Sequence, residues 1–218
     1  MSATATIEAP VSVPAAPARN DTHATDTRHR FTLKEYFALE AASEIRYEYD
    51  EGELIPMAGT SAPHNRITLN LSFAFDQAFG DGSCEVYMQT VGFRVSPLKY
   101  RYPDVMALCG TPQFDDRNPP CLLNPNVVVE VLSDSTENTD KGRKIEEYLQ
   151  LETVTDYLLV AQNRVSVAHW SKNSERDWTR KEYIELSDTV TLSSIGVTVT
   201  LAEVYRRVKF DTADDGIL

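Results

Sequence analysis

Between residues 61 and 80, apolar side chains recur at spacings of three and four, which predicts an amphipathic helix. Ser61 can cap the start of this helix, and Gly80-Asp81-Gly82 ends it. A shorter helix is expected from the capping box Thr32-Leu33-Lys34-Glu35 to about Ala42. Further helical segments are expected over residues 139–151 and 201–208.

From residue 84 onward the spacing of the apolar residues shifts to two, which predicts β-strands. Val127-Val128-Val129-Glu130-Val131-Leu132 is instead almost continuously apolar, as is typical of a central strand covered on both faces. Together with the helices, these strands predict an α/β (α+β) domain in which helices flank a central mixed β-sheet. The other expected strands cover residues 46–50, 53–57, 84–88, 91–95, 104–108, 157–161, 165–170, 179–184, 190–192 and 197–199.

The composition divides the chain of 218 residues into a folded part and tails. Residues 1–30 are rich in Ala, Thr, Pro and Ser and contain no Phe, Tyr or Trp. Such a segment buries too little apolar surface to offset the entropy of ordering. We therefore expect a disordered N-terminal tail over 1–30, one domain over 31–209 and a short C-terminal tail over 210–218.

The formal net charge is −12, and the charges within residues 1–30 cancel. An acidic protein is not drawn to nucleic acid by bulk attraction, which excludes a histone-like or arginine-rich binder. Any role on nucleic acid must then depend on a local site, such as one that carries a divalent metal ion.

The three cysteines, Cys84, Cys109 and Cys121, are an odd number and form no CxxC pair. This pattern favours reduced thiols over a secreted disulfide framework or a zinc site. No apolar run approaches the ~20 residues that span a bilayer, and the N-terminus lacks the features of a secretory signal. We therefore expect a cytoplasmic protein with no membrane partner.

Glu130 lies inside the continuous apolar run and is the most informative position of the chain. An ionised carboxylate there loses several kcal/mol of hydration unless something compensates for it. The compensation can be a buried ion pair, a raised pKa or a metal cation, and the residues alone leave these alternatives open.

Asp104 opens another apolar strand, directly after Pro103. Two acidic residues on two core strands can converge at one end of a sheet, where their oxygens would suit magnesium or manganese. A turn-capping role is the alternative, because Asp beside Pro is common in turns.

Lys141 and Lys144 lie three residues apart in the helical segment after Glu130, beside the stripe of Ile145 and Tyr148. From there a lysine could reach back to the strand that carries Glu130. Lysines on an amphipathic helix also commonly extend to solvent, so this alternative stays open as well.

These segments resemble the Uma-type family of predicted restriction endonucleases of bacteria, which belongs to the PD-(D/E)XK nuclease superfamily. The resemblance extends in the family's order over roughly residues 31–208. It is carried by Arg46-Tyr47-Glu48, Gly52-Glu53, Met57-Ala58-Gly59, His64-Asn65-Arg66-Ile67, Tyr102-Pro103-Asp104, the 127–133 strand, Ser135-Thr136-Glu137, Asp140-Lys141-Gly142-Arg143-Lys144, Asp156–Val160, Val165–Val167, Ser194–Val197 and Leu201–Tyr205.

The resemblance implies a restriction endonuclease-like core and metal-dependent hydrolysis of DNA phosphodiester bonds. Asp104 and Glu130 would hold one or two Mg²⁺ (or Mn²⁺) ions, and the Val131 carbonyl and Glu48 would add oxygens. The metal would activate water and polarise the phosphate. Cleavage of both strands would favour a homodimer with two sites.

The sequence departs from the superfamily at Leu132, where the usual lysine stands two residues after the acid. A leucine neither donates a hydrogen bond nor orients water, so Lys144, or less readily Lys141, would take over that function from the helix. A catalytically weak fold member that acts as a binding or assembly module is the alternative. A glycosidase with two carboxylates ranks last, because the sequence offers few aromatic platforms for sugars.

His64 matches a family position on the second helix and is a candidate accessory residue beside the phosphate. An equally weighted alternative is that His64 is only a polar residue at the start of the helix. Arg94, Lys99 and Arg101, with neighbouring tyrosines, form a basic and aromatic cluster that could meet a phosphate backbone.

Overall fold

The computed structural model describes residues 29–43, 45–57, 59–132, 140–173 and 177–210. Nearly all of both expected tails lies outside these ranges, so the domain boundaries stay predictions. The helical elements are α1 (Leu33–Ala42), α2 (Ala62–Phe79), the π-helical turn η1 (Asp140–Lys144), α4 (Ile145–Leu149) and α5 (Leu201–Val204).

Both N-terminal helices begin at the capping residues that the sequence indicates. The Thr32 side chain accepts a hydrogen bond from the Glu35 backbone, and the Glu35 carboxylate accepts one from the Thr32 backbone. The Ser61 hydroxyl accepts from the backbone N–H of His64, which fixes His64 in the first turn of α2. The caps thus confirm the predicted starts of these helices.

A six-stranded mixed sheet forms the centre of the domain, in the order β11-β10-β9-β8-β6-β3. Only β8 and β9 run parallel, and the other neighbours are antiparallel. This sheet confirms the expected mixed α/β architecture. Its strands are β3 (Cys84–Met88), β6 (Val105–Cys109), β8 (Val127–Leu132), β9 (Asp156–Ala161), β10 (Val167–Lys172) and β11 (Trp178–Tyr183).

A second sheet of five strands has the order β2-β1-β5-β4-β7, and β12 and β13 form a separate hairpin. The sequence pattern did not indicate β5 and β7, because β5 is the charged triplet Lys99-Tyr100-Arg101 and β7 has only two residues. The strands are β1 (Tyr47–Asp50), β2 (Glu53–Pro56), β4 (Gly92–Ser96), β5 (Lys99–Arg101), β7 (Cys121–Leu122), β12 (Thr189–Leu192) and β13 (Val197–Thr200).

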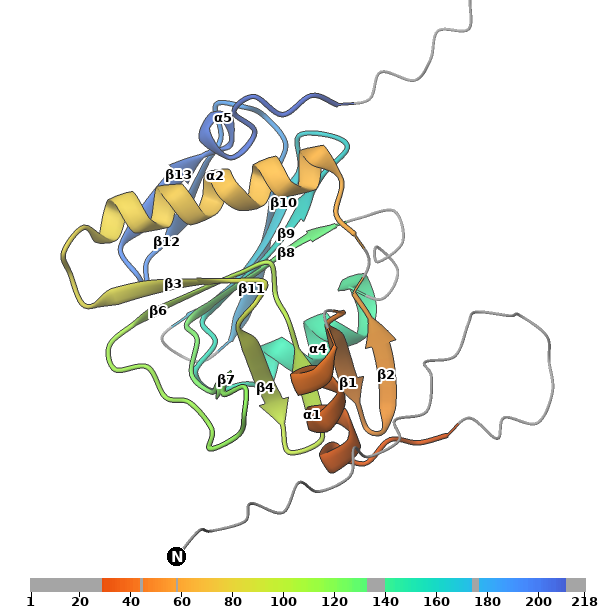
Figure 1. The fold of residues 1–218 in the computed structure, drawn as a ribbon. Coiled ribbons are helices and arrows are strands. Elements are labelled where there is room, and N and C mark those ends of the chain that lie inside the picture. The colour runs from red at the N-terminus through yellow and green to blue at the C-terminus, as the bar shows by residue number, and fades with distance from the viewer. Residues whose placement is uncertain (1–28, 44, 58, 133–139, 174–176, 211–218) are drawn as a thin grey trace, which may run out of the picture.

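Apolar cores cover both faces of β8, which explains its continuous apolar sequence. The valines at odd positions of β8 belong to the core that α2 covers. Val128 and Leu132 belong to a second core, with Tyr148 of α4 and Phe93 of β4. Figure 1 shows α2 on one side of the central sheet and α4 with the second sheet on the other. Glu130 alternates with Val128 and Leu132, so it belongs to the α4 side.

The C-terminal helices are shorter than the spacing of apolar residues predicts. The expected helix over 139–151 begins as η1 at Asp140 and ends at Leu149. The expected helix over 201–208 ends at Val204. Arg207 has a φ of 61°, a left-handed conformation that cannot continue a right-handed helix.

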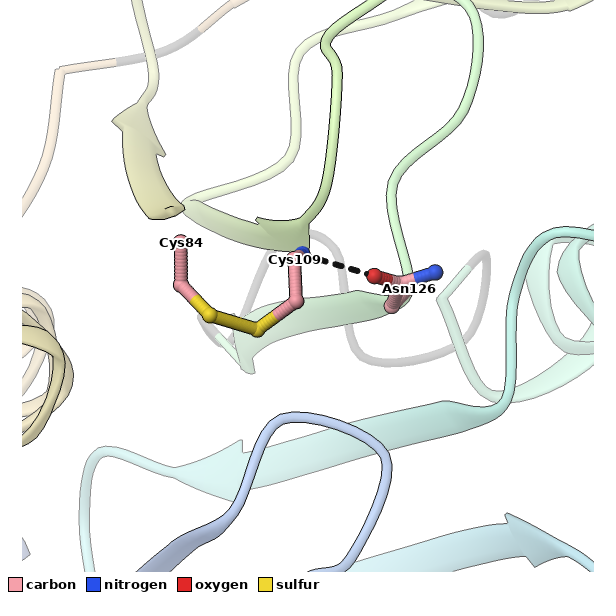
Figure 2. The surroundings of a disulfide bond; sticks show 3 residues. All are labelled: Cys84, Cys109 and Asn126. Carbon is pink, nitrogen blue, oxygen red and sulfur yellow. Dashed lines mark hydrogen bonds between the residues drawn. A yellow bond between two sulfur atoms is a disulfide. The ribbon is translucent and has the colours of Figure 1, made fainter. Parts of the chain in front are cut away.

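The prediction of three reduced cysteines is wrong for one pair, because Cys84 and Cys109 form a disulfide (Figure 2). The two residues face each other in the antiparallel register of β3 and β6. Asn126 accepts a hydrogen bond from the Cys109 backbone N–H at 2.8 Å, and Cys121 is a free, buried thiol. A separation of 25 residues along the chain does not reveal such a pairing. The cysteines therefore no longer support a cytoplasmic location.

No helix in the described ranges is long and apolar enough to cross a membrane.

We expect reduction with dithiothreitol to lower the free energy of unfolding by about 2–4 kcal/mol, because the crosslink restricts the unfolded chain. Urea unfolding with and without the reductant measures the difference. The double variant Cys84→Ala, Cys109→Ala is the control and should be insensitive to dithiothreitol. Equal unfolding midpoints for the wild type in both conditions would contradict the assignment.

Candidate functional site

Asp104 and Glu130 lie just beyond the paired part of β6 and β8. Val105 and Val129 are the last pair of these antiparallel strands, and Asp104 precedes Val105 while Glu130 follows Val129. Both acids are almost fully buried, with 7% and 4% of their surface exposed. The two acids that the sequence singles out therefore belong to the same end of this strand pair.

The Asp104 carboxylate is held by three elements. Its Oδ2 accepts a hydrogen bond from the Val131 backbone N–H at 2.6 Å and lies 3.2 Å from His64 Nε2 of α2. Its Oδ1 accepts from the Gln89 side chain at 2.6 Å, and Gln89 directly follows β3. Asp104 is thus fixed next to the backbone of the strand that carries Glu130.

Lys144 lies between two buried carboxylates. Its Nζ is 3.2 Å from Glu130 Oε1 and 2.9 Å from Glu48 Oε1. The Tyr148 hydroxyl also donates to Glu130 Oε1, at 3.0 Å. Burial raises the pKa of Tyr148 well above its usual value, so this hydroxyl stays protonated and acts as a donor. Lys144 therefore reaches back to Glu130, as the sequence predicts.

Arg101 of β5 connects the second sheet to α4 and so positions Glu48 relative to Lys144. Its guanidinium, 2% exposed, donates to Asp50 Oδ2 at 3.0 Å and to Glu147 Oε2 at 2.9 Å. Burial opposes its charge, but Glu48 and Glu147 keep the pKa of Arg101 above its ordinary value. Part of the expected basic cluster is therefore a buried structural contact and does not face a nucleic acid.

The structure brings most of the predicted residues together. Glu48, Glu130 and Lys144 form one ion-paired group, and Asp104 contacts the backbone of Val131, the residue after Glu130. The side chain of Lys141 lies outside the described part, so its accessory role stays a prediction.

His64 and Val131 both contact Asp104, as described above, and neither contact involves the Val131 carbonyl. Within the described residues, His64 Nδ1 is buried and has no hydrogen-bond partner. His64 thus contacts the site as an accessory residue would, through one ring nitrogen.

Sequence reasoning missed Gln89 and the hydrogen bond of Tyr148. Nothing in the sequence around Gln89 signals its contact, because that contact depends on the register of β3 against β6. Tyr148 lies on the helix stripe that the sequence assigns to the core, and its hydroxyl could have been expected to need a buried partner.

Asp104 and Glu130 are the carboxylates here whose chemistry suits a hard divalent cation. In the described residues, no group of three or more His, Cys, Asp and Glu side chains is arranged to hold a metal ion. Mg²⁺ commonly binds through one or two carboxylates and completes its shell with water and phosphate oxygens. Both acids already have protein partners, because Asp104 contacts Val131, His64 and Gln89, and Glu130 contacts Lys144 and Tyr148.

Comparisons with known proteins show the family of this chain and a solved structure of similar fold. The sequence model of the family described as "Uma2: Putative restriction endonuclease" matches residues 33–202. The crystal structure of "a putative nuclease belonging to DUF820" from Anabaena variabilis ATCC 29413 is similar in fold, with a TM-score of 0.61 and 13% identity. The match covers 75% of this chain and 91% of that one.

Two similar sequences come from Synechocystis sp. (strain ATCC 27184 / PCC 6803 / Kazusa). The uncharacterized protein sll1609 is 35% identical over 152 residues, which are 69% of this chain and 86% of that protein. The uncharacterized protein slr1290 is 33% identical over 182 residues, which are 83% of this chain and 94% of that protein.

The carboxylate of Asp50 is one of the buried charges next to the candidate site, and its contribution to stability can be tested by changing the pH. Burial alone would raise the pKa of this carboxyl, but Arg101, Arg143 and Lys99 hold the pKa below its usual value. A carboxyl with a lowered folded-state pKa stabilises the fold above its unfolded-state pKa, and this contribution is lost as the pH falls through the folded-state pKa.

We therefore expect Asp50→Asn to lower the free energy of unfolding by about 1–3 kcal/mol at neutral pH. The difference from the wild type should shrink below about pH 4, where the wild-type carboxyl also becomes protonated. Urea unfolding across this pH range measures it, with Asp76→Asn on the exposed face of α2 as the control. A difference that is the same at pH 7 and in acid would rule out this role for Asp50.

Proposed function

Because the chain belongs to the Uma2 family, we propose that it is a Mg²⁺-dependent endonuclease that hydrolyses phosphodiester bonds in DNA. The observation that carries this proposal is the hydrogen bond of Asp104 to the Val131 backbone, directly after Glu130, together with the contact of Lys144 with Glu130. A buried acid inside an apolar strand and a lysine from the next helix are hard to explain by packing alone.

Asp104 and Glu130 would hold the metal ion, with the Val131 carbonyl and the Glu48 carboxylate as further oxygen donors. Mn²⁺ would suit the same oxygen donors. When bound, the ion supplies an activated water, a polarised phosphate oxygen and stabilisation of the leaving oxygen.

The protein's own residues supply positioning and charge. The Lys144 ammonium would stabilise negative charge that develops on the phosphate, in place of the side chain that Leu132 lacks. Tyr148 donates to Glu130 and so fixes the orientation of that carboxylate. His64 and Gln89 do the same for Asp104.

DNA is the proposed substrate in spite of the net charge of −12. The acidic surface gives no general attraction for nucleic acid, so recognition would be confined to the site and its neighbourhood. Cleavage of both strands would require two sites, and we propose a homodimer as the form that supplies them.

DNA binding without efficient cleavage is the second candidate, and one observation favours it. Glu48 and Glu130 already neutralise the Lys144 ammonium, so less of its charge is available to a phosphate. A binding or assembly module would have the same fold but would cleave DNA slowly or not at all.

We expect the wild type to nick supercoiled plasmid in Mg²⁺ or Mn²⁺, and Asp104→Asn and Glu130→Gln each to lower the rate about 10²-fold or more. These changes keep the size of each side chain and remove its charge. Gel electrophoresis of the plasmid over time measures the rate. Asp76→Asn, an exposed acid on α2, should nick like the wild type. Equal nicking rates for the wild type and both site variants would contradict the proposal that Asp104 and Glu130 act in cleavage.

Metal binding can be tested without turnover. We expect titration calorimetry to detect heat from Mn²⁺ with the wild type, and this heat should be lost in Glu130→Gln because one of the two principal carboxylate ligands is gone. The Asp76→Asn control should keep it. Absence of heat in the wild type would favour the binding module over the enzyme.

A further inference from the structure

A pocket of about 240 Å³ adjoins the candidate site on the α4 side of the central sheet. It is lined by Leu159 and Ala168 of the sheet, Ile145 of α4 and Trp170 of β10, and by Arg164, which lies in the turn between β9 and β10. Nothing in the comparisons assigns a role to this pocket.

Small side chains explain why the sheet is hollow at this point. Ala161, Ser166 and Ala168 line the pocket between the larger side chains of Leu132 and Trp170. Its volume lies below the about 300–1,000 Å³ that is typical of sites for larger small-molecule ligands. The space therefore suits a single flat ring system.

The lining combines apolar side chains, an aromatic ring and two guanidinium groups. Arg180 lies over the ring of Trp170, 5.2 Å from its centroid, and also contacts Glu182 at 3.1 Å. Arg164 and Arg180 are exposed, whereas Trp170 is half-buried. Aromatic rings and guanidinium planes stack on bases, and guanidinium groups bind phosphates. This set of groups is complementary to a nucleobase with its phosphate.

The residues that line the pocket are neighbours of Glu130 and Lys144. Leu132 lines it and follows Glu130 by two residues on the same face of β8, a separation of about 7 Å along a strand. Leu159 of β9, which also lines the pocket, pairs directly with Glu130 of β8. Ile145 immediately follows Lys144. A group in the pocket would therefore neighbour a phosphate held at Asp104 and Glu130.

We propose that this pocket receives one unstacked nucleobase of the strand whose phosphate lies at the candidate site. Arg164 and Arg180 bind the phosphate of that nucleotide, and Trp170 contacts the base. Glu182, released from Arg180, accepts a hydrogen bond from an exocyclic amino group. The identification of a nucleic-acid strand rests on the proposed function, and the pocket deepens it by selecting bases that are already out of the helical stack.

Fluorescence anisotropy of a short, fluorescein-labelled single-stranded DNA with the full chain tests the proposal, in EDTA so that no cleavage occurs. Ala168→Leu fills the pocket and should weaken binding about tenfold or more, the loss expected for one base–aromatic contact. Arg164→Ala and Arg180→Ala change exposed residues, keep the core intact and should each weaken binding several-fold.

Arg206→Ala is the matched control, because Arg206 is an exposed arginine after α5 on the α2 side of the sheet. It removes the same charge and should leave the affinity unchanged. Equal losses in Arg206→Ala and the two pocket arginine variants would show a general charge effect and overturn the proposal. An unchanged affinity in all pocket variants would also overturn the proposal. Tighter binding of the wild type to a free mononucleotide than to the single strand would do the same.

The outcome is distinguishable from that of the proposed function. Pocket-dependent binding without plasmid nicking would overturn the nuclease and keep the base pocket. If the protein nicks plasmid and the pocket variants bind single-stranded DNA as tightly as the wild type, the base-pocket proposal is overturned and the nuclease proposal stands.

Discussion

The cost of burying charge is the constraint on which this structure depends. Several charged side chains lie between the two sheets, and each would destabilise the fold without a partner of opposite sign. Arg101 meets this constraint by joining β1, β5 and α4 through Asp50 and Glu147. Because Glu48 belongs to β1 and Lys144 directly precedes α4, the same contacts determine where the candidate site forms.

The site combines two features that the mixed sheet makes available together. Antiparallel pairing of β6 with β8 brings Asp104 to the backbone next to Glu130, while the parallel neighbour β9 is reached through η1 and α4, and η1 supplies Lys144. The segment that connects β8 to β9 thus places the Lys144 ammonium next to Glu130 of β8. The fold that supports this arrangement is similar to that of the solved putative nuclease, and the chain belongs to the Uma2 family.

Local signals predicted much of the fold, and long-range pairing accounts for what they missed. The caps Thr32 and Ser61 mark the helix starts, and the apolar run marks β8 with its full bounds. The single acid within that run singled out Glu130, and Lys144, ahead of Lys141, was its expected partner from the next helix. Strand register decided the rest: it opposes Cys84 to Cys109 and brings Gln89 to Asp104. Nothing in the residues near each position reports a neighbour from another strand.

By accepting the hydrogen bond from the Val131 N–H, the Asp104 carboxylate also has a structural role in the sheet. The pairing of β6 with β8 ends at Val105 and Val129, so Asp104 acts there as a substitute for the missing strand backbone. A proton or a cation that engages this carboxylate competes with the amide for the same oxygens. Ligation at the acid and order at this margin of the sheet are therefore thermodynamically linked, and each changes the equilibrium of the other.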